Sequence, residues 1–340
     1  MENAQFLVHT ICLVYNHENY INDAMNGFSM QQTSFPVVSV IIDDASTDHT
    51  VDVLNHYLKD HFILDDPDAV DKETDYGHVT FARHKSNANC FFAVICLKEN
   101  HYSKAKDKYP YYEEWANTKY VAICEGDDYW TDPLKLQKQV DILEADESLM
   151  AVVTNSKVVD KEGNELMAKQ ENVVPDNKEG RYDLRSFMNN VHHYPTATVC
   201  YRRTHTEEIA EMTTHMANPY LGDWTLWIAL HIFGDFYYLD QVTSAYRINP
   251  TSVTHTCDRV NRAKANWTIC KAVQDILPEE YDDIRKSLDD KLWMWINLAF
   301  AYRSEKKYLP MSWCFLVAFV KSPKGLIADF KKRKSKKMKS

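Results

Sequence analysis

The chain has 340 residues and a formal net charge of −10, from 39 basic and 49 acidic residues. Apolar residues make up 45% of it, which is enough for a sizeable core and excludes disorder for most of the chain. Its eight glycines are never closer than Gly222 and Gly234. That spacing excludes the GxGxxG, GxxxxGK and GxSxG motifs, so any phosphate is held without a glycine-rich loop.

The eight cysteines include no CxxC pair, and several lie inside apolar runs such as residues 10–14. This pattern favours buried, reduced thiols over a disulfide framework or a zinc site. The first residues show no signal-peptide pattern, and the longest apolar run near the end, residues 313–320, is too short to span a bilayer. We therefore expect a cytoplasmic protein.

Charge is spread unevenly. Residues 331–340 hold seven basic residues and no acid, which leaves −17 on the rest of the chain. An acidic body argues against nucleic acid as a partner. The basic segment allows two interpretations: peripheral contact with the anionic inner face of the plasma membrane, at about 1 kcal/mol per Lys or Arg, or a solvated end.

The first 130 residues alternate between strand and helix patterns, which indicates a parallel α/β sheet. Continuous apolar runs of strand length predict strands, and apolar residues at helical spacing predict helices. In chain order the predicted elements are strand 8–14, helix 19–32, strand 37–42, helix 50–58, strand 79–82, helix 90–97 and strand 120–124.

Further along, Asp132 and Pro133 mark the start of a helix over 133–146, followed by a strand over 151–159 and a turn at 160–164. Residues 259–330 are mostly helical in pattern. The predicted organisation is a domain over 1–255, with a nucleotide-binding half (1–130) and an acceptor-side half (131–255). A helical extension (256–330) and the basic segment (331–340) follow.

Carboxylates follow two of the predicted strands. Asp43 and Asp44 come after the second, and Glu125, Asp127 and Asp128 after the fourth. Because ligands bind beyond the carboxyl ends of strands in open α/β sheets, we expect these acids at one edge of the sheet. Such a cluster suits a hard divalent cation. Helix capping is the alternative, but Ser46, Thr47 and Asp132 stand closer to the helix starts.

Five ordered blocks resemble the family 2, GT-A fold, nucleotide-sugar glycosyltransferases over residues 6–255, and especially bacterial members that build surface polysaccharides. The resemblance implies an α/β fold: a GT-A type, Rossmann-like, mostly parallel sheet flanked by helices. The blocks are VYNHENYI at 14–21, IDDASTDHT at 42–50, CEGDDYWTDP at 124–133, GDW at 222–224 and YR at 246–247.

The resemblance also implies roles. Tyr15 would lie against the nucleotide base, and Asp44 would accept a hydrogen bond from a base N–H such as that of uracil. Asp127 would approach the ribose. Asp128 would bind the Mn²⁺ or Mg²⁺ that bridges the diphosphate, and Asp223 would be the general base of an inverting enzyme. Helix capping is the other interpretation of Asp223.

Other residues carry open alternatives. Trp224 contacts the acceptor or belongs to the core, and Arg247 binds the diphosphate or forms a structural ion pair. Arg83, after the third strand, binds the nucleotide at its phosphates or is surface charge. Where the family often reads Tyr-Arg-x-His, this chain has Asn249, so His255 is the candidate metal ligand, with a structural histidine as the alternative.

The expected function is transfer of a sugar from a UDP-sugar to a hydroxyl of a glycan or lipid-linked acceptor, with inversion, in assembly of the bacterial cell envelope. A sugar-nucleotide pyrophosphorylase is one alternative, but the loop at 15–19 lacks the glycine and basic residues that such enzymes place there. A non-catalytic, nucleotide-binding partner subunit is the other.

Overall fold

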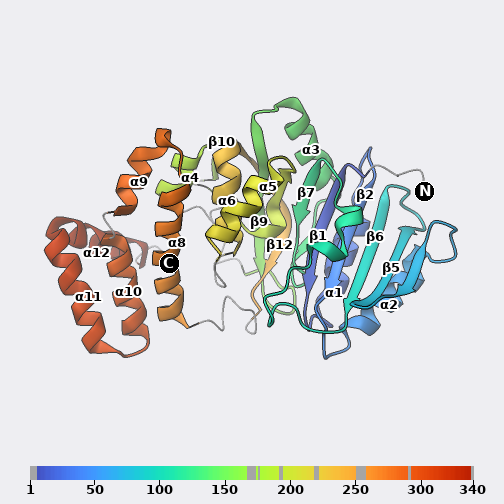
Figure 1. Ribbon diagram of the computed structural model, residues 1–340, viewed down its shortest axis with the longest axis horizontal. Coiled ribbons are helices and arrows are strands. Elements are labelled where there is room, and N and C mark those ends of the chain that lie inside the picture. The colour runs from blue at the N-terminus through green and yellow to red at the C-terminus, as the bar shows by residue number, and fades with distance from the viewer. Residues whose placement is uncertain are drawn as a thin grey trace. The chain divides into compact units, whose positions relative to one another are not determined.

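The structure is a computed structural model that describes residues 6–166, 174, 177–190, 194–217, 222–249, 258–289 and 292–337 (Figure 1). The chain divides into two compact units. The first unit comprises Met1–Thr204 and Gly234–Ile248, and the second His205–Phe233 and Asn249–Ser340. This division does not test the domain boundary predicted near residue 255, which stays a prediction.

The first unit is built on one large sheet, with strand order β10-β12-β9-β11-β7-β1-β2-β6-β5-β3; β4 pairs with β5, and β8 with β12. The strands are β1 (Val8–Val14), β2 (Val37–Asp43), β3 (Phe62–Ile63), β4 (Val70–Glu73), β5 (Gly77–His84), β6 (Cys90–Leu97), β7 (Tyr120–Ile123), β8 (Tyr129–Trp130), β9 (Leu149–Val159), β10 (Gly180–Tyr182), β11 (Val199–Arg202) and β12 (Asp235–Arg247).

Four neighbouring strands, β7, β1, β2 and β6, run parallel and form the centre of the sheet. Every residue of β2 is buried, as expected of a strand covered on both faces. Antiparallel pairings extend the sheet on both sides, through β5 next to β6 and through β11 next to β7. The predicted α/β class is confirmed, with antiparallel strands added to its parallel centre.

The helix predicted over residues 90–97 is wrong, because this segment is β6. Its sequence, CFFAVICL, is an apolar run of eight residues, and a short continuous run does not separate a strand from a buried helix. Inserting β6 next to β2 also reverses the direction of β5, which pairs antiparallel with β6. The residues at the end of β5 therefore lie at the opposite edge from the one expected.

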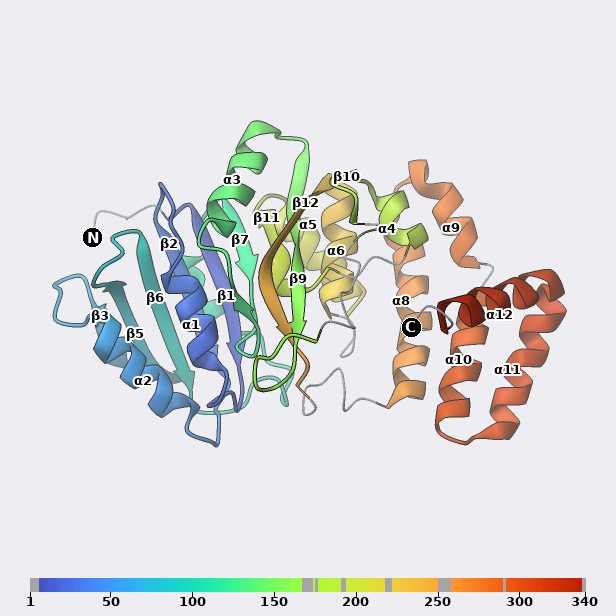
Figure 2. The ribbon, with the colours of Figure 1, turned by 180° about the vertical axis from the view of Figure 1, so that it is seen from behind.

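Three helices cover one face of this sheet, as Figure 2 shows: α1 (Ile21–Ser29), α2 (Thr50–His61) and α3 (Lys135–Ala145). Val37 and Ile41 of β2 point into the core on this side. Their neighbours Val38, Val40 and Ile42 point to the other side. The N-cap of α3 is Leu134 and not the predicted Asp132, which instead accepts the Leu134 N–H at 2.9 Å just before the helix.

The opposite face of β2, β5 and β6 is covered by the segment between β6 and β7, drawn in teal in Figure 1. It contains the short 3₁₀ helices η1 (Tyr109–Tyr111) and η2 (Glu113–Trp115). Trp115 is 7% exposed and packs in the core there. The first unit also contains α4 (Leu184–Asn190) and η5 (Thr196–Thr198).

The second unit is helical where the structure describes it, in agreement with the pattern over 259–330. Its helices are α5 (Thr206–His215), α6 (Gly222–Phe233), α8 (Arg259–Ile276), η6 (Glu279–Tyr281), α9 (Asp282–Asp289), α10 (Leu292–Ser304), α11 (Tyr308–Lys321) and α12 (Pro323–Lys337). Val260, Leu298 and Cys314 join α8, α10 and α11 in one core. No single helix in the described part of the chain could cross a membrane by length and composition, whereas Tyr308–Lys321 with Pro323–Lys331, bent by 117°, meets that test as a pair.

Helix α1 lies against the backbone of β8, which leads into α3. A Cβ added at Gly27 would lie 2.8 Å from the Trp130 nitrogen and 3.0 Å from its carbonyl oxygen, whereas one added at Gly222 meets no atom within 4 Å. We expect Gly27→Ala to lower the free energy of unfolding by about 1–3 kcal/mol through overpacking. Gly222→Ala should change it by less than about 1 kcal/mol. Urea unfolding followed by tryptophan fluorescence checks this, and equal midpoints for the two variants would contradict the close approach.

Candidate active site

The loops that follow β1 and β2 are hydrogen-bonded into one rim at the carboxyl edge of the sheet. Asn16 and Ala45 adopt left-handed backbone conformations, with φ of 56° and 60°. The bonds between the loops are Asn16 N–H to Ser46 Oγ (2.8 Å), Thr47 N–H to Asn16 Oδ1 (2.8 Å), His17 N–H to Thr50 Oγ1 (2.8 Å), and His49 N–H to Glu18 Oε2 (2.9 Å). These bonds preorganise the rim before any ligand arrives.

The capping predicted for Ser46 and Thr47 is not what the structure shows. Asp48 instead accepts a hydrogen bond from the Thr50 N–H at 3.0 Å, at the start of α2. The Ser46 hydroxyl and N–H both donate to Asp43. Asp43 is 1% exposed, and burial raises the pKa of its carboxyl group against the effect of the Ser46 bonds. Asp43 therefore supports the loop from beneath.

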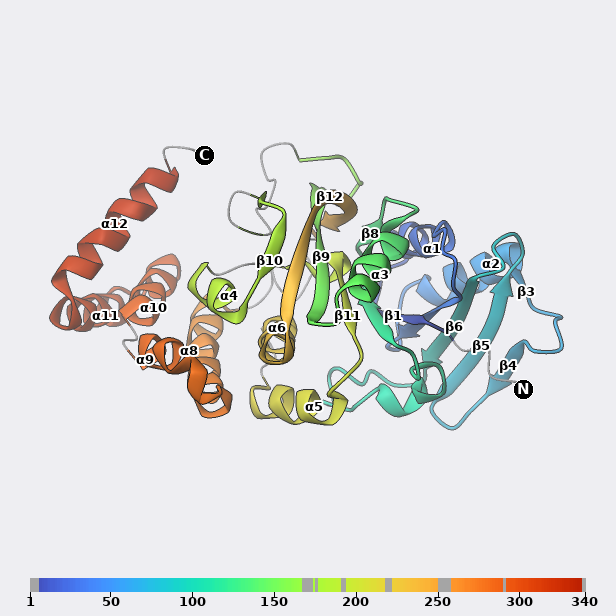
Figure 3. The ribbon, with the colours of Figure 1, turned by 90° about the horizontal axis from the view of Figure 1, so that it is seen from above.

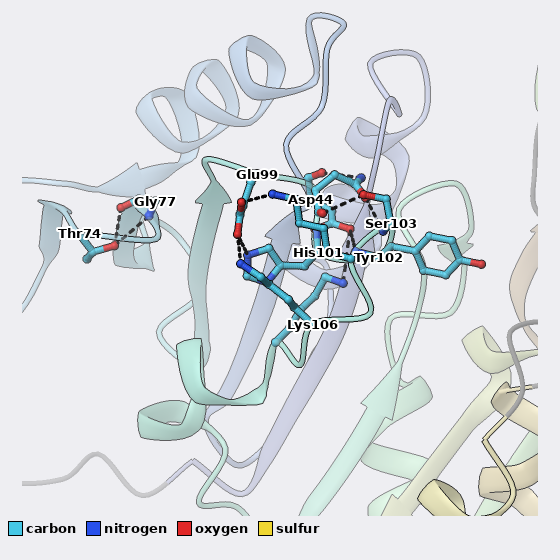
Figure 4. Close-up of polar contacts among 11 residues, drawn as sticks. Asp44, Thr74, Gly77, Glu99, His101, Tyr102, Ser103 and Lys106 are labelled. Atoms are coloured by element: carbon cyan, nitrogen blue, oxygen red, sulfur yellow. Dashed lines mark hydrogen bonds and ion pairs between the residues drawn. The ribbon is translucent and has the colours of Figure 1, made fainter.

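Asp44 holds the loop that follows β6 (Figure 4). Its Oδ1 accepts the His101 N–H at 2.7 Å, and its Oδ2 accepts the Tyr102 N–H at 3.0 Å. The Lys108 ammonium lies 3.4 Å from Oδ2, and Asp44 is only 5% exposed. An N–H group of a nucleobase that approaches this carboxylate must share it with the two backbone N–H groups and the ammonium, or displace them. No residue spacing in the sequence pointed to this loop.

Glu99, at the start of the same loop, holds the loop through two ion pairs within it. It forms ion pairs with Lys104 and Lys106, as Figure 4 shows for Lys106. These two cations hold the pKa of Glu99 at about 2. The loop is thus tied to Asp44 at its backbone and to itself at its surface.

The acidic loop after β7 reaches the same edge. Its Gly126 N–H donates to the Leu13 carbonyl at 3.1 Å, and the Asp44 N–H donates to the Val14 carbonyl at 2.8 Å. Both acidic segments therefore flank the carboxyl end of β1, as the strand order requires. Tyr15, the next residue along, is 46% exposed and presents a free aromatic surface at this rim.

Asp128 is the most buried acid of the loop after β7, at 4% exposure. Its Oδ1 accepts the Arg247 N–H at 2.8 Å. Burial, together with the neighbouring Asp127 and Glu125 carboxylates, raises the pKa of Asp128 well above its usual value. The fold therefore disfavours the ionised form of Asp128, and a bound cation would offset that penalty.

Arg247 has a structural environment. Its side chain is 2% exposed. The guanidinium donates to the carbonyls of Asp127 (2.9 Å) and Lys161 (3.0 Å) and forms an ion pair with Asp23 at 2.6 Å. Of the two interpretations left open by the sequence, these contacts support the structural ion pair over a diphosphate contact. Arg247 thus fixes the backbone that carries both acids of the pair.

Arg83 lies at the wrong edge of the sheet to join this cluster. It is level with Phe91 of β6, which is level with Val38 of β2. Asp43 is five residues further along β2, about 17 Å away at the rise of a strand. Arg83 is instead paired with Asp66 at 3.6 Å. The predicted nucleotide contact is therefore corrected to surface charge, because β5 runs antiparallel.

His17 belongs to the rim but received no role from the sequence. A Cβ added at Gly126 would lie 2.8 Å from its Nδ1, so the ring packs on the acidic loop. This buried nitrogen has no hydrogen-bond partner in the described structure. Burial lowers the pKa of His17, although Asp127 acts in the opposite direction.

Asp223 and Trp224 lie at the start of α6, in the second unit. The Asp223 Oδ1 accepts the Trp224 N–H at 2.8 Å within the first turn of α6, and both side chains are partly buried. Their roles as general base and acceptor contact stay predictions. His255 lies outside the described residues.

The acidic pair fits a hard cation held in part by its substrate. The described residues contain no group of three His, Cys, Asp or Glu side chains able to enclose a metal. Mg²⁺ sites, however, commonly use one or two carboxylates together with substrate phosphates and water, and Mn²⁺ also favours oxygen ligands. Asp127 and Asp128 supply carboxylate oxygens of that kind.

Comparison with known proteins shows the fold. No family model matches the chain. The uncharacterized protein Mb1547 of Mycobacterium bovis is 29% identical over 254 residues, which are 72% of this chain and 60% of that protein. The uncharacterized protein Rv1520 of Mycobacterium tuberculosis matches equally. The chain thus spans about 60% of the length of these relatives.

Two solved structures share the architecture. Residues 1–349 of TarS from S. aureus, in complex with UDP-GlcNAc, match with a TM-score of 0.55 and 14% identity, over 87% of this chain and 72% of that one. The mannosyltransferase PcManGT from Pyrobaculum calidifontis, in complex with GDP-Man and Mn²⁺, matches with a TM-score of 0.53 and 13% identity, over 97% and 80%. The chain therefore has the Rossmann-like fold of the GT-A class.

The two arginines predicted at phosphate should behave differently when replaced by lysine. Arg247→Lys leaves buried carbonyls without donors, and we expect a loss of about 2–4 kcal/mol in the free energy of unfolding. Arg83→Lys, at an exposed ion pair, should cost less than about 0.5 kcal/mol. Urea unfolding of both variants tests this. A large loss at Arg83, or none at Arg247, would contradict the placement of these side chains.

Proposed function

We propose that the chain is a metal-dependent, inverting glycosyltransferase of family 2 that takes its sugar from a UDP-sugar. The observation that carries the proposal is the acid pair Asp127–Asp128, held at the carboxyl edge of the parallel strands beside the exposed Tyr15. Nucleotide-sugar complexes of proteins with this fold support it. The acceptor is a hydroxyl of a glycan or lipid-linked glycan, in surface-polysaccharide assembly at the cytoplasmic side of the bacterial envelope.

The chemical difficulty in this reaction is the negative charge that develops on the departing diphosphate. Bound Mn²⁺ or Mg²⁺ supplies Lewis-acid stabilisation of that charge. Asp128 would hold the ion and Asp127 would approach the ribose, while the Arg247 N–H orients Asp128 by its bond to Oδ1. The Asp127 carboxylate opposes ionisation of the buried Asp128 when no cation is present, so metal and nucleotide binding would relieve a cost already present in the fold.

Nucleotide recognition falls to the rim. Tyr15 is an exposed ring at the end of β1 and stacks on the base, while Asp44 accepts a base N–H. Because the Asp44 oxygens also accept the His101 and Tyr102 N–H groups, the loop over 99–108 forms one wall of the base site. Asp44 is only 5% exposed, and uracil, which is smaller than a purine base, suits the limited space beside it.

Transfer to the acceptor requires a general base. In an inverting transfer the acceptor hydroxyl attacks from the face opposite the diphosphate, and a carboxylate that removes its proton contributes roughly 10²–10⁴ in rate. Asp223 takes this role in the proposal, and Trp224 contacts the acceptor.

The loop after β1 lacks glycine and basic residues, which disfavours a pyrophosphorylase. Turnover separates the enzyme from a non-catalytic nucleotide-binding subunit.

Asp128→Asn should have opposite effects with and without ligand. The folded-state pKa of Asp128 is raised above its unfolded value of about 4. Stability that is present below that value is therefore lost as pH rises toward the folded pKa. We expect the variant to melt at a higher temperature than the wild type at pH 7 without metal, by several degrees, and to lose the rise that Mn²⁺ with UDP gives the wild type.

The control for this experiment is Asp65→Asn, which makes the same charge change at an exposed residue. It should match the wild type in both conditions. A metal-dependent rise retained by Asp128→Asn would refute its assignment as a ligand.

Asp223→Asn should separate binding from transfer. The substitution keeps the shape of the side chain and removes its basicity, so UDP binding with Mn²⁺ should be unchanged while transfer falls at least 10²-fold. The substrate for the assay is any nucleotide-sugar that raises the wild-type melting temperature in a screen. Glu207→Gln, in the first turn of α5, is the control and should keep full turnover. Normal turnover by Asp223→Asn would refute the assignment of Asp223 as the general base.

A further inference from the structure

Helix α11 is apolar on two opposite sides. Residues 308–320 contain no charged side chain. One side, with Cys314 and Ala318, packs against α10. The other side carries a row of exposed residues at spacings of four, three and four. They are Leu309 (88% exposed), Trp313 (62%), Leu316 (52%) and Val320 (75%).

Single exposed apolar side chains are ordinary, but a continuous row on one helix is not. A helix that is apolar all round is normally buried on every side, in a protein core or in lipid. At 3.6 residues per turn, the positions 309, 313, 316 and 320 fall on one line, opposite the packed side. The outer side of α11, hereafter the apolar row, therefore needs a cover.

The charges around the apolar row identify the kind of cover. Lys306 and Lys307 precede α11, Lys321 is its last residue, and Lys324 follows it. The seven basic residues at 331–340 then lie in and beyond the second half of α12. A surface that combines exposed aliphatic and indole groups with basic flanks matches the interface of an anionic lipid bilayer.

The basic helix is fixed to the same group of helices as the apolar row. Arg333 of α12 donates to the Asn297 side chain of α10 at 2.7 Å and lies 4.5 Å from the centre of the Phe300 ring. Phe330 also packs on Phe300 and Phe315. Figure 3 shows α12 leaving its corner with α11 beside α10. Helix α12 and the apolar row thus belong to one packed cluster.

We propose that α10–α12 dock the protein on an anionic lipid bilayer, with the apolar row inserted at the headgroup boundary and the basic residues of 331–340 on the lipid phosphates. The helix has 14 residues and is about 21 Å long, shorter than the roughly 30 Å hydrocarbon layer, so it lies in the interface. This inference stands independently of the proposed catalytic function. It assigns the apolar part of the contact to the exposed row on α11.

Co-sedimentation of the full chain with vesicles tests this. The wild type should sediment with vesicles of phosphatidylcholine and phosphatidylglycerol and much less with phosphatidylcholine alone. The variant Leu309→Ser/Trp313→Ser/Leu316→Ser/Val320→Ser changes only exposed positions and should bind the anionic vesicles at least tenfold more weakly. Leu64→Ser, at an exposed leucine of the first unit, is the control and should bind like the wild type.

The charge contribution has its own matched pair. Lys331→Gln/Lys334→Gln/Lys337→Gln should weaken binding to anionic vesicles by about fivefold per lysine. Lys59→Gln/Lys72→Gln/Lys161→Gln, at exposed lysines of the first unit, removes the same charge and should have little effect. Circular dichroism of each variant checks that it is folded.

Two results would overturn the proposal. One is a wild type that remains in the supernatant with anionic vesicles. The other is a wild-type dimer in light scattering that the four-serine variant dissociates, without any vesicle binding. That second outcome would make another copy of this chain the cover of the apolar row.

Discussion

The central constraint in this protein is the burial of like charges at one edge of the sheet. Parallel strands bring their carboxyl ends together, so the acids that follow β2 and β7 meet beside the end of β1. Asp128 is almost fully covered, and its neighbours raise its pKa further. Such a cluster reduces stability unless a cation joins it. In our account the fold accepts that cost because a metal nucleotide removes it during each catalytic cycle.

The surroundings of the cluster are arranged to keep it rigid. Asn16 and Ser46 lock two loops together, and Arg247 fixes the backbone of the acidic loop from behind. Preorganised groups of this kind stabilise developing charge without reorganising during the reaction. The loop held by Asp44 is the exception. It is attached through the same carboxylate that we propose accepts a hydrogen bond from the nucleobase. If Asp44 binds the nucleobase as we propose, donor binding and the position of that loop are coupled.

Much of this was predictable from local sequence. Continuous apolar runs predicted β1, β2 and β7, and the position of Asp128 just after a predicted strand placed it at the carboxyl edge of the sheet. The segment 90–97 was misassigned because eight apolar residues fit a strand or a buried helix equally, and Arg83 was misplaced as a consequence. The partners of Arg247 lie more than 80 residues away or across the sheet, where spacing carries no information. Tertiary contacts, not local pattern, decide whether such a side chain faces ligand or core.

The most direct test of the account is a calorimetric titration of UDP into the protein, with and without Mn²⁺. If the acid pair holds a cation that bridges the diphosphate, Mn²⁺ should tighten UDP binding at least tenfold, and the Asp128→Asn variant should lose that gain. Equal UDP affinity with and without the metal would contradict the central claim.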